Sequence, residues 1–388
     1  MLQKVSGSFT PLKGLNSIKF DRIYHNTWSK MQSKSLRAFS GIQPTGSLHL
    51  GNYLGAIKNW LELQNNGLNS HIFNEKKQKN DSNLENIFCI VNSHAITSLR
   101  DAEQLRQNTL ETACMLFACG LDPDSSIIFI QSEILEHPAL AWILDCNIFM
   151  GEMNRMTQFK DKSAQNPQNI NVGLFNYPAL MAADILLYDA NLVPVGADQK
   201  QHIELTRNVA ARFNAHFAKN ENKEKTEGFI IPDPLIVGES AKIMGLDNPQ
   251  IKMSKSIKSQ NHAIFLLDSE SEIDKKIKKA QTDNFNEIIF SDDPLRAGVK
   301  NLLSIYQIFS SKTKEQIEHH FEGKGYGALK SELSELVISH LKPIRTKYLQ
   351  LLDDKSYINS ALQNGKNRAQ EIASSTYKRI SDLVGLQI

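Results

Sequence analysis

Apolar positions along the chain follow two different periods. Three short runs are almost continuously apolar, which is typical of strands buried on both faces: residues 87–91, 126–131 and 192–195. Residues 36–43 predict a further strand, the first, which runs into a Pro-Thr-Gly turn. Between these runs apolar residues recur at helical spacing, as Leu50, Leu54, Ile57 and Leu61 do. Because strands that alternate with helices form βαβ units, the pattern predicts an α/β protein with a parallel sheet.

Beyond about residue 269 the pattern is helical throughout. Ile273 and Ile277 share one helix face, and the lysines between positions 275 and 279 crowd the rest of that helix. We expect those lysines to form a solvated face, with RNA contact as the alternative. Further amphipathic stretches cover residues 302–308, 329–341 and 358–383. The sequence therefore predicts a sheet domain over residues 36–268 and a helical domain over residues 269–388.

The first 37 residues of the chain differ from the rest in composition. Their basic residues are Lys4, Lys13, Lys19, Arg22, Lys30, Lys34 and Arg37, against a single acid, Asp21. A basic, serine-rich and acid-poor start is typical of an organellar transit peptide, which we predict for residues 1–35. The alternative is a disordered cytosolic extension, with Met31 as a second start.

The charge balance, the cysteine spacing and the length of the apolar stretches limit which partners and metal sites we expect. Lys and Arg number 44 and Asp and Glu 42, so an RNA partner would need basic groups that are concentrated locally. Cys89, Cys114, Cys119 and Cys146 form no C-x-x-C pair, which favours reduced thiols and no metal site. No apolar stretch approaches the roughly 18 residues that span a bilayer, so no membrane partner is expected.

The strongest candidate for chemistry is the segment from Ser40 to Tyr53, with the sequence SGIQPTGSLHLGNY. It predicts a strand, a Gly/Pro turn and a helix start, where free N–H groups and the helix dipole attract phosphate. Gly51 allows a flat group to approach the backbone, and His49 and Asn52 project from one face. Taken alone, the segment could also be an ordinary glycine-rich turn.

A second candidate is Lys252-Met253-Ser254-Lys255-Ser256. Two ammonium groups three residues apart, with hydroxyl groups beside them, suit a polyphosphate that gains charge as pyrophosphate leaves. A basic surface loop is the ordinary alternative for five residues.

The two segments together resemble the two signatures of class I aminoacyl-tRNA synthetases. Within that class, residues 36–383 are similar to the tryptophanyl-tRNA synthetases of bacterial or organellar type. The matching stretches are GIQPTG at 41–46, HAIT at 94–97, QSE at 131–133, GEMNRMTQFK at 151–160, MAADILLY at 181–188, VPVGADQKQH at 193–202, Tyr306 and GKGYG at 323–327.

The resemblance implies a Rossmann-like catalytic domain with a mobile phosphate loop at Lys252–Ser256, and a helical domain that binds the tRNA anticodon. Residues that match ATP-contacting positions are Gln43, Pro44, Thr45, Gly51, Asn52, Lys162, Gly196, Ala197, Asp198, Ile243, Lys252, Met253, Ser254, Lys255 and Ser256. Catalytic roles fall on His49, Asn52, Lys252, Ser254 and Lys255. Residues that match the tryptophan pocket are Phe39, His94, Tyr177, Met181, Asp184, Val193, Val195 and Gln199.

Asp184 matches the acid that accepts the indole N–H, and it stands in an apolar helical run. Since a buried carboxylate without partners is costly, the alternative is a capped or ion-paired structural Asp. His94, Met181 and Phe39 would also suit an ordinary core. The chain departs from the family at Asn92-Ser93, where an acidic residue and a second polar group are usual. This departure puts a role for position 92 in binding the substrate ammonium in doubt.

The expected activity is tryptophan–tRNA ligation: ATP with Mg²⁺ activates L-tryptophan, and the adenylate is passed to tRNA(Trp). The family resemblance also implies a homodimer, and the composition of residues 1–35 favours the mitochondrial matrix over the cytoplasm. Three alternatives stay open: the tyrosine-specific sister enzyme, an adenylyltransferase that acts on a small metabolite, and a non-catalytic RNA-binding relative.

Overall fold

A five-stranded sheet, in the order β3-β2-β1-β4-β5, forms the centre of the molecule, and every neighbouring pair is parallel. The computed structural model describes residues 36–69, 84–98, 101–165, 168, 170–196, 199–218, 227–236 and 243–387. The strands are β1 (Leu36–Ile42), β2 (Leu84–Ile90), β3 (Ser126–Ile130), β4 (Leu192–Val195) and β5 (Asp233–Ile236). The first four confirm the predicted strands and the parallel sheet; the segment 1–35 lies outside the described residues.

Strand β5 was not predicted, and its sequence explains why. Asp233 and Pro234 open it, so only Leu235 and Ile236 continue an apolar pattern. Proline cannot donate to a sheet ladder and is tolerated on an edge strand, which is where β5 lies.

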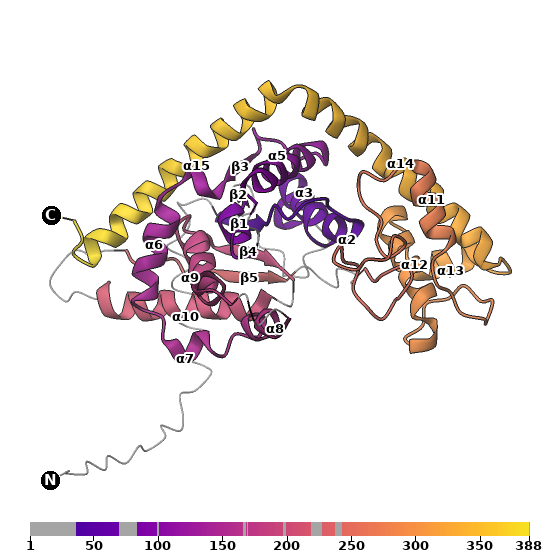
Figure 1. The fold of residues 1–388 in the computed structure, drawn as a ribbon, viewed down its shortest axis with the longest axis horizontal. Coiled ribbons are helices and arrows are strands. Elements are labelled where there is room, and N and C mark those ends of the chain that lie inside the picture. Colours follow the sequence, from indigo (N-terminus) through magenta and orange to yellow (C-terminus); the bar gives the residue numbers. More distant parts are fainter. Residues whose placement is uncertain are drawn as a thin grey trace, which may run out of the picture.

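Helices cover both faces of the sheet (Figure 1). Successive side chains of β2 point to opposite faces: Phe88 packs into the cluster that contains Trp60 of α3 (Lys58–Asn66) and residues of α5 (Ala102–Ala118). Ile87 packs into the opposite cluster, against residues of α6 (Glu136–Asp145), α9 (Val172–Leu186) and α10 (Lys200–Phe217). Strand β2 is therefore buried on both sides, as its continuous apolar run predicts.

The predicted helix after the first turn is a compound element. It begins as α2 (Leu50–Asn52), passes through one π-helical stretch, η1 (Tyr53–Ile57), and continues as α3. Asp101 accepts a hydrogen bond from the Gln104 N–H at the start of α5, and Gly120 follows that helix with a φ of 110°. An acidic N-cap and a left-handed glycine after the last turn are typical helix boundaries.

Short elements complete the sheet part of the chain. They are η2 (Gly67–Asn69), α4 (Asn92–Ala95), η3 (Gln131–Glu133), α7 (Met150–Met153) and α8 (Thr157–Gln165). Within the residues that the structure describes, no helix combines the length and the apolar character needed to cross a membrane.

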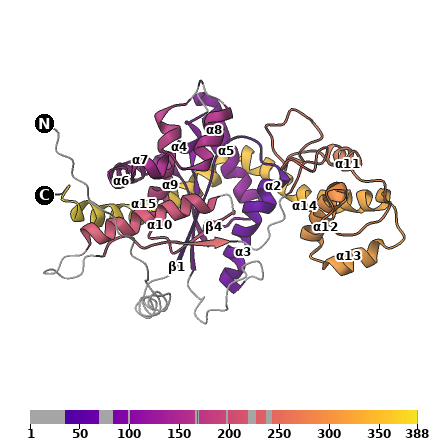
Figure 2. The same ribbon diagram turned by 90° about the horizontal axis from the view of Figure 1, so that it is seen from below.

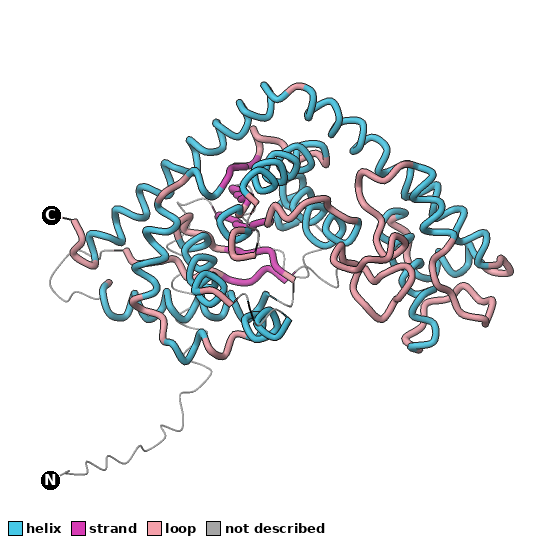
Figure 3. Tube along the Cα trace, viewed as in Figure 1, coloured by secondary structure: helices cyan, strands magenta, loops and turns pink. Residues whose placement is uncertain are grey.

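The C-terminal part is helical from α11 onward. Its elements are α11 (Glu270–Lys278), η6 (Pro294–Arg296), α12 (Ala297–Ser310), α13 (Lys314–Phe321), α14 (Tyr326–Asp353) and α15 (Lys355–Leu383). Figure 2 shows α11 to α13 gathered to one side of the sheet, and Figure 3 shows the loops that lead into them. The lysines of α11 are not all solvated as expected, because Lys276 is buried and pairs with Asp268 at 2.5 Å.

Helix α15 runs back from the helical part to the sheet (Figure 1). It packs along β3, the edge strand, and against α6. At Gly365 the two backbones are so close that an added Cβ would lie 1.8 Å from the carbonyl oxygen of Ile128. The glycine therefore sets how near α15 can approach the sheet.

Gly365→Ala is expected to lower the stability of the protein by about 1–3 kcal/mol, because the new methyl group must push α15 away from β3. Chemical denaturation measures the change. Gly327→Ala in α14 is the matched control, since nothing lies within 4 Å of its Cβ position. Equal stability of the two variants would contradict the backbone contact.

Candidate active site

A cavity of about 400 Å³ opens at the carboxyl ends of β1 and β4. The chain reaches β2 and β3 on one side of β1 before it crosses to β4 on the other side. Ligands of open parallel sheets bind where the strand order reverses in this way. The fold therefore places the cavity where a nucleotide-binding sheet holds its ligand.

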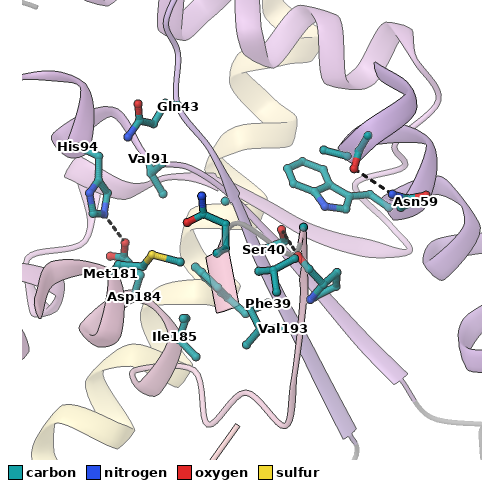
Figure 4. A pocket seen from close by; sticks show the side chains of 18 of the residues that line it. Phe39, Ser40, Gln43, Asn59, Val91, His94, Met181, Asp184, Ile185 and Val193 are labelled. Carbon is teal, nitrogen blue, oxygen red and sulfur yellow. Dashed lines mark hydrogen bonds and ion pairs between the residues drawn. The ribbon is translucent and has the colours of Figure 1, made fainter. Parts of the chain in front are cut away.

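All eight residues predicted for the tryptophan pocket line this cavity. They are Phe39, His94, Tyr177, Met181, Asp184, Val193, Val195 and Gln199. Gln43 and Gly196, predicted for ATP, line it as well. In Figure 4, His94, Met181 and Asp184 lie at one end of the pocket and Asn59 lies at the other.

Sequence reasoning missed a second wall of the cavity. Gly55 and Ala56 of η1 and Asn59 and Trp60 of α3 also line it. Gly55 and Ala56 belong to a π-helical turn that lies immediately before α3. Such turns often occur at functional sites, but their position is not visible in an ordinary helical pattern.

Asp184 is almost completely buried, and its carboxylate accepts three hydrogen bonds. His94 Nε2 lies 2.8 Å from Oδ2, while His137 Nδ1 and Gln131 Nε2 lie 2.6 and 2.7 Å from Oδ1. Burial works against the charged form, but the hydrogen bonds and charges of His137 and His94 hold the pKa of Asp184 below its usual value. The acid is therefore ionised at neutral pH, with donors on both oxygens.

His137, which the sequence interpretation did not single out, also contacts Asp184. It stands behind Asp184, outside the cavity lining, and its Nε2 lies 2.9 Å from the hydroxyl of Tyr188. If that hydroxyl donates to Nε2, then Nδ1 carries the proton and donates to Asp184. The signal in the sequence was weak, because His137 belongs to a helix that begins among polar residues.

The two phosphate-type segments meet in space. The Lys255 ammonium group donates to the carbonyl oxygen of Thr45, in the turn after β1. An added Cβ at Gly51 would lie 3.7 Å from the Cβ of Met253. The second segment therefore lies directly over the first.

The start of α2 differs from the expectation of free N–H groups. Leu50 N–H donates to the carbonyl of Ile264 at 2.8 Å, and Asn52 N–H donates to the carbonyl of His49 at 2.9 Å. The space above Gly51 is occupied by the His49 ring, 3.1 Å from the Cβ position. The segment is thus fixed by a neighbouring strand-like stretch instead of presenting an open row of donors.

His49 is buried, and its Nδ1 has no hydrogen-bond partner among the described residues. Burial, together with the positive charges of Lys255 and Lys252, lowers its pKa to about 4. At neutral pH His49 is therefore a neutral group with an unused polar atom. Such an atom would gain a partner when a polar ligand enters.

For several of the other residues predicted to bind ATP, the structure gives less detail. Ile243 is buried beside the loop, and Pro44 follows Gln43 in the turn. Ala197 and Asp198 lie outside the described residues, and Lys162 belongs to α8, where its side chain is not described.

Asn92, where the chain departs from the family pattern, exchanges two hydrogen bonds with Ser132 and so connects α4 to η3.

A parallel sheet with this order, a pocket at its switch point and a basic loop over the first turn together define a nucleotide-binding α/β enzyme of the class I synthetase type. The family model for class I tRNA synthetases of the W and Y type matches residues 31–342. The tryptophan–tRNA ligase of Wolinella succinogenes is 54% identical over 350 residues, which cover 90% of this chain and 98% of that protein.

Solved structures agree with this family. Tryptophanyl-tRNA synthetase from Mycoplasma pneumoniae matches with a TM-score of 0.77 and 36% identity, over 91% of this chain and 99% of that one. The enzyme from Campylobacter jejuni, solved with ADP and tryptophan, matches with a TM-score of 0.71 and 33% identity, over 90% and 100%. The chain belongs to the tryptophan–tRNA ligase family of class I aminoacyl-tRNA synthetases.

His137→Leu is expected to destabilise the protein by about 3 kcal/mol, because it leaves the buried Asp184 carboxylate without one of its donors. Adding Asp184→Asn should recover part of that loss, since a neutral amide tolerates burial better. Urea denaturation of both variants measures the effect. His216→Leu, at an exposed position on α10, is the control and should lose little stability. A loss of stability in His137→Leu as small as that of the control would contradict the pairing of His137 with Asp184.

Proposed function

We propose that the protein activates L-tryptophan with ATP, releases pyrophosphate and transfers the tryptophanyl group to tRNA(Trp). The observation that carries the proposal is the buried, ionised Asp184 in a cavity that Gln43 of the first phosphate-type segment also lines, while Lys255 of the second segment contacts the turn just after Gln43. The names of the W. succinogenes and C. jejuni relatives support the same substrate.

The tryptophan end of the site follows from the acceptor capacity of Asp184. A carboxylate has about four acceptor positions, and His94, His137 and Gln131 occupy three of them. His94 lines the cavity while the other two donors do not, so Oδ2 is the oxygen on the pocket side. Its free position suits the indole N–H, and Phe39, Tyr177, Met181, Val193, Val195 and Gln199 surround the ring.

Specificity follows from the same acceptor. A site built to pair a substrate N–H rejects analogues that lack it by roughly 10⁴–10⁵. Tyrosine has no donor at the place of the indole nitrogen, so it would leave the buried acid unpaired. This argument separates the protein from the tyrosine-specific sister enzymes that share the fold.

ATP, which enters as its magnesium complex, would lie between the cavity and the loop. Gln43, Pro44, Thr45 and Gly51 would line its first contact, with Gly196, Ala197, Asp198 and Ile243 near the adenosine and Lys162 as a further cation. Asn52 accepts a hydrogen bond from the His49 N–H, which holds both residues at the turn. Lys252, Met253, Ser254, Lys255 and Ser256 would close over the phosphates.

The chemistry needs no covalent enzyme intermediate. The tryptophan carboxylate attacks the α-phosphorus of ATP, the bond to the β-phosphate oxygen breaks, and pyrophosphate takes the charge. Lys252 and Lys255 stabilise that charge, Ser254 adds a hydroxyl donor, and neutral His49 contributes a hydrogen bond. The terminal ribose hydroxyl of tRNA then displaces AMP from the adenylate.

The remaining parts of the chain carry finer proposals. Residues 269–388 would bind the anticodon region of the tRNA, and residues 1–35 would direct the protein to the mitochondrial matrix. The composition of that segment supports import. The relatives named above are bacterial, which supports the cytoplasmic alternative. Import into isolated mitochondria distinguishes the two.

ATP–pyrophosphate exchange with each of the twenty amino acids tests the activity, and exchange should require tryptophan. Lys255→Ala should lower the rate constant about a hundredfold with little change in tryptophan binding, because its charge acts mainly in the transition state. Asp184→Asn should lose the preference for tryptophan over tyrosine.

Lys258→Ala and Asp124→Asn, both at exposed positions, are the matched controls for these variants. Exchange that needs no amino acid would favour a small-metabolite adenylyltransferase, and no exchange at all would favour a non-catalytic RNA-binding protein. Full tryptophan preference in Asp184→Asn would remove the assignment of the acid.

The family resemblance also supports a homodimer, and the surface around α6 and α7 offers a place for it. Leu135, Trp142, Phe149 and Met150 are each more than 60% exposed. Leu135 and Trp142 are seven residues apart, so they share one face at α6, and Phe149 and Met150 mark the start of α7. Clustered exposed apolar side chains mark protein interfaces.

Trp142→Asp is expected to convert the dimer to a monomer, since a charge at a packed apolar interface is not compensated. Analytical ultracentrifugation measures the state. Leu349→Asp, at an exposed apolar position of α14, should leave it unchanged. A wild-type protein that sediments as a monomer would end this proposal without affecting the others.

A further inference from the structure

The base of the Lys252–Ser256 loop is a small antiparallel ribbon. Met244 and Lys252 form an antiparallel bridge, Gly245 N–H donates to the carbonyl of Ile251 at 2.8 Å, and Met253 N–H donates to the carbonyl of Ile243 at 2.9 Å. The loop that carries the two ammonium groups therefore leaves from a defined backbone position at Lys252.

His262 closes this ribbon from the far end of the loop. Its side chain is buried, and its carbonyl accepts a hydrogen bond from the Leu246 N–H at 3.0 Å. The imidazole lies against Gly245, where an added Cβ would stand 2.0 Å from its Cε1 atom. The glycine thus provides the space that the ring occupies.

Both ring nitrogens of His262 face acceptors. Nδ1 lies 2.6 Å from Oδ1 of Asp247, and Nε2 lies 3.2 Å from the carbonyl oxygen of Lys252. A carboxylate and a backbone carbonyl can only accept, so each nitrogen must carry a proton for both bonds to form. A neutral imidazole has one N–H and could make only one of them.

The charged groups around the ring are consistent with a cation. The other oxygen of Asp247 accepts from the Ser259 hydroxyl. Although burial works against its ionised form, the hydrogen bonds from Ser259 and His262 keep the pKa of Asp247 below its ordinary value. The basic side chains of this region are Lys252, Lys255 and His49. Burial and the two lysines lower the pKa of His49 to about 4, so His49 is neutral at neutral pH.

We propose that His262 is a positioning residue of the phosphate loop: its doubly protonated ring joins the Lys252 carbonyl to Asp247 and fixes where the loop begins. Two residues later, Ile264 accepts from Leu50 N–H, so the same stretch also fixes the first phosphate segment. The charge of His262 is thereby linked to the placement of Lys252 and Lys255. The proposal rests on the proposed activation of tryptophan by ATP.

The test compares wild type with His262→Gln and Asp247→Asn in tryptophan-dependent pyrophosphate exchange across the pH range where histidines titrate. At the acidic end kcat of His262→Gln should be roughly tenfold lower, with an unchanged KM for tryptophan, because the tryptophan pocket is separate from the ribbon. The ratio of wild-type to variant kcat should be largest at acidic pH and fall toward one at alkaline pH, because only a ring that carries both protons can donate to Asp247 and to the Lys252 carbonyl at once.

His216→Gln is the matched control, since that histidine is exposed on α10, and its ratio to wild type should not change with pH. A ratio that stays near one at every pH for His262→Gln would overturn the proposal. So would an equal rise in the KM for tryptophan, because that result indicates a general structural loss.

A second measurement does not depend on activity. In wild-type protein labelled with ¹⁵N-histidine, both ring nitrogens of His262 should show protonated chemical shifts, and Asp247→Asn should remove one of them. One unprotonated ring nitrogen in wild type below neutral pH would overturn the proposal. If no amino acid supports exchange, the proposed function fails while this measurement still decides the state of His262.

Discussion

The whole pocket depends on a carboxylate that is buried and still charged. Asp184 has lost its water, so every stabilising contact must come from side chains, and three separate elements supply them: α4 through His94, η3 through Gln131 and α6 through His137. Such an arrangement is stable only when all its members are paired. The acid thus links the ends of β2 and β3 to α9 and sets the shape of the cavity.

The second constraint is that the two phosphate-type segments are far apart in the sequence and must be held together in space. Lys255 contacts the turn after β1 directly, and the stretch 264–266, which follows the second segment, forms backbone hydrogen bonds with residues 48–50 of the first. Asn301 of α12 adds a further support, because its side chain both donates to and accepts from the backbone of Met244. The helical part of the chain therefore holds the ribbon from which the loop leaves.

Much of this arrangement could be predicted from the sequence. Apolar runs predicted β2, β3 and β4, because burial on both faces leaves a clear pattern. The stretch that enters the Pro-Thr-Gly turn predicted β1, and the alternation with helices predicted the parallel sheet. Strand β5 escaped because Pro234 interrupts a very short edge strand. The pocket residues came from family resemblance, whereas His137 and His262 act through other side chains and stand in no local pattern. Only their positions in space reveal those roles.

Two buried histidines near the loop illustrate why composition cannot assign charge. His49 has cations as neighbours and an unpaired Nδ1, so its neutral form is favoured. His262 has a carboxylate and a carbonyl as neighbours, so both of its nitrogens are required as donors. The two rings have the same chemistry and similar burial, and their opposite protonation states follow from their partners. A positive His262 therefore places a fixed charge at the base of the loop, beside the Lys252 carbonyl, while a neutral His49 keeps an unpaired Nδ1 for a polar ligand.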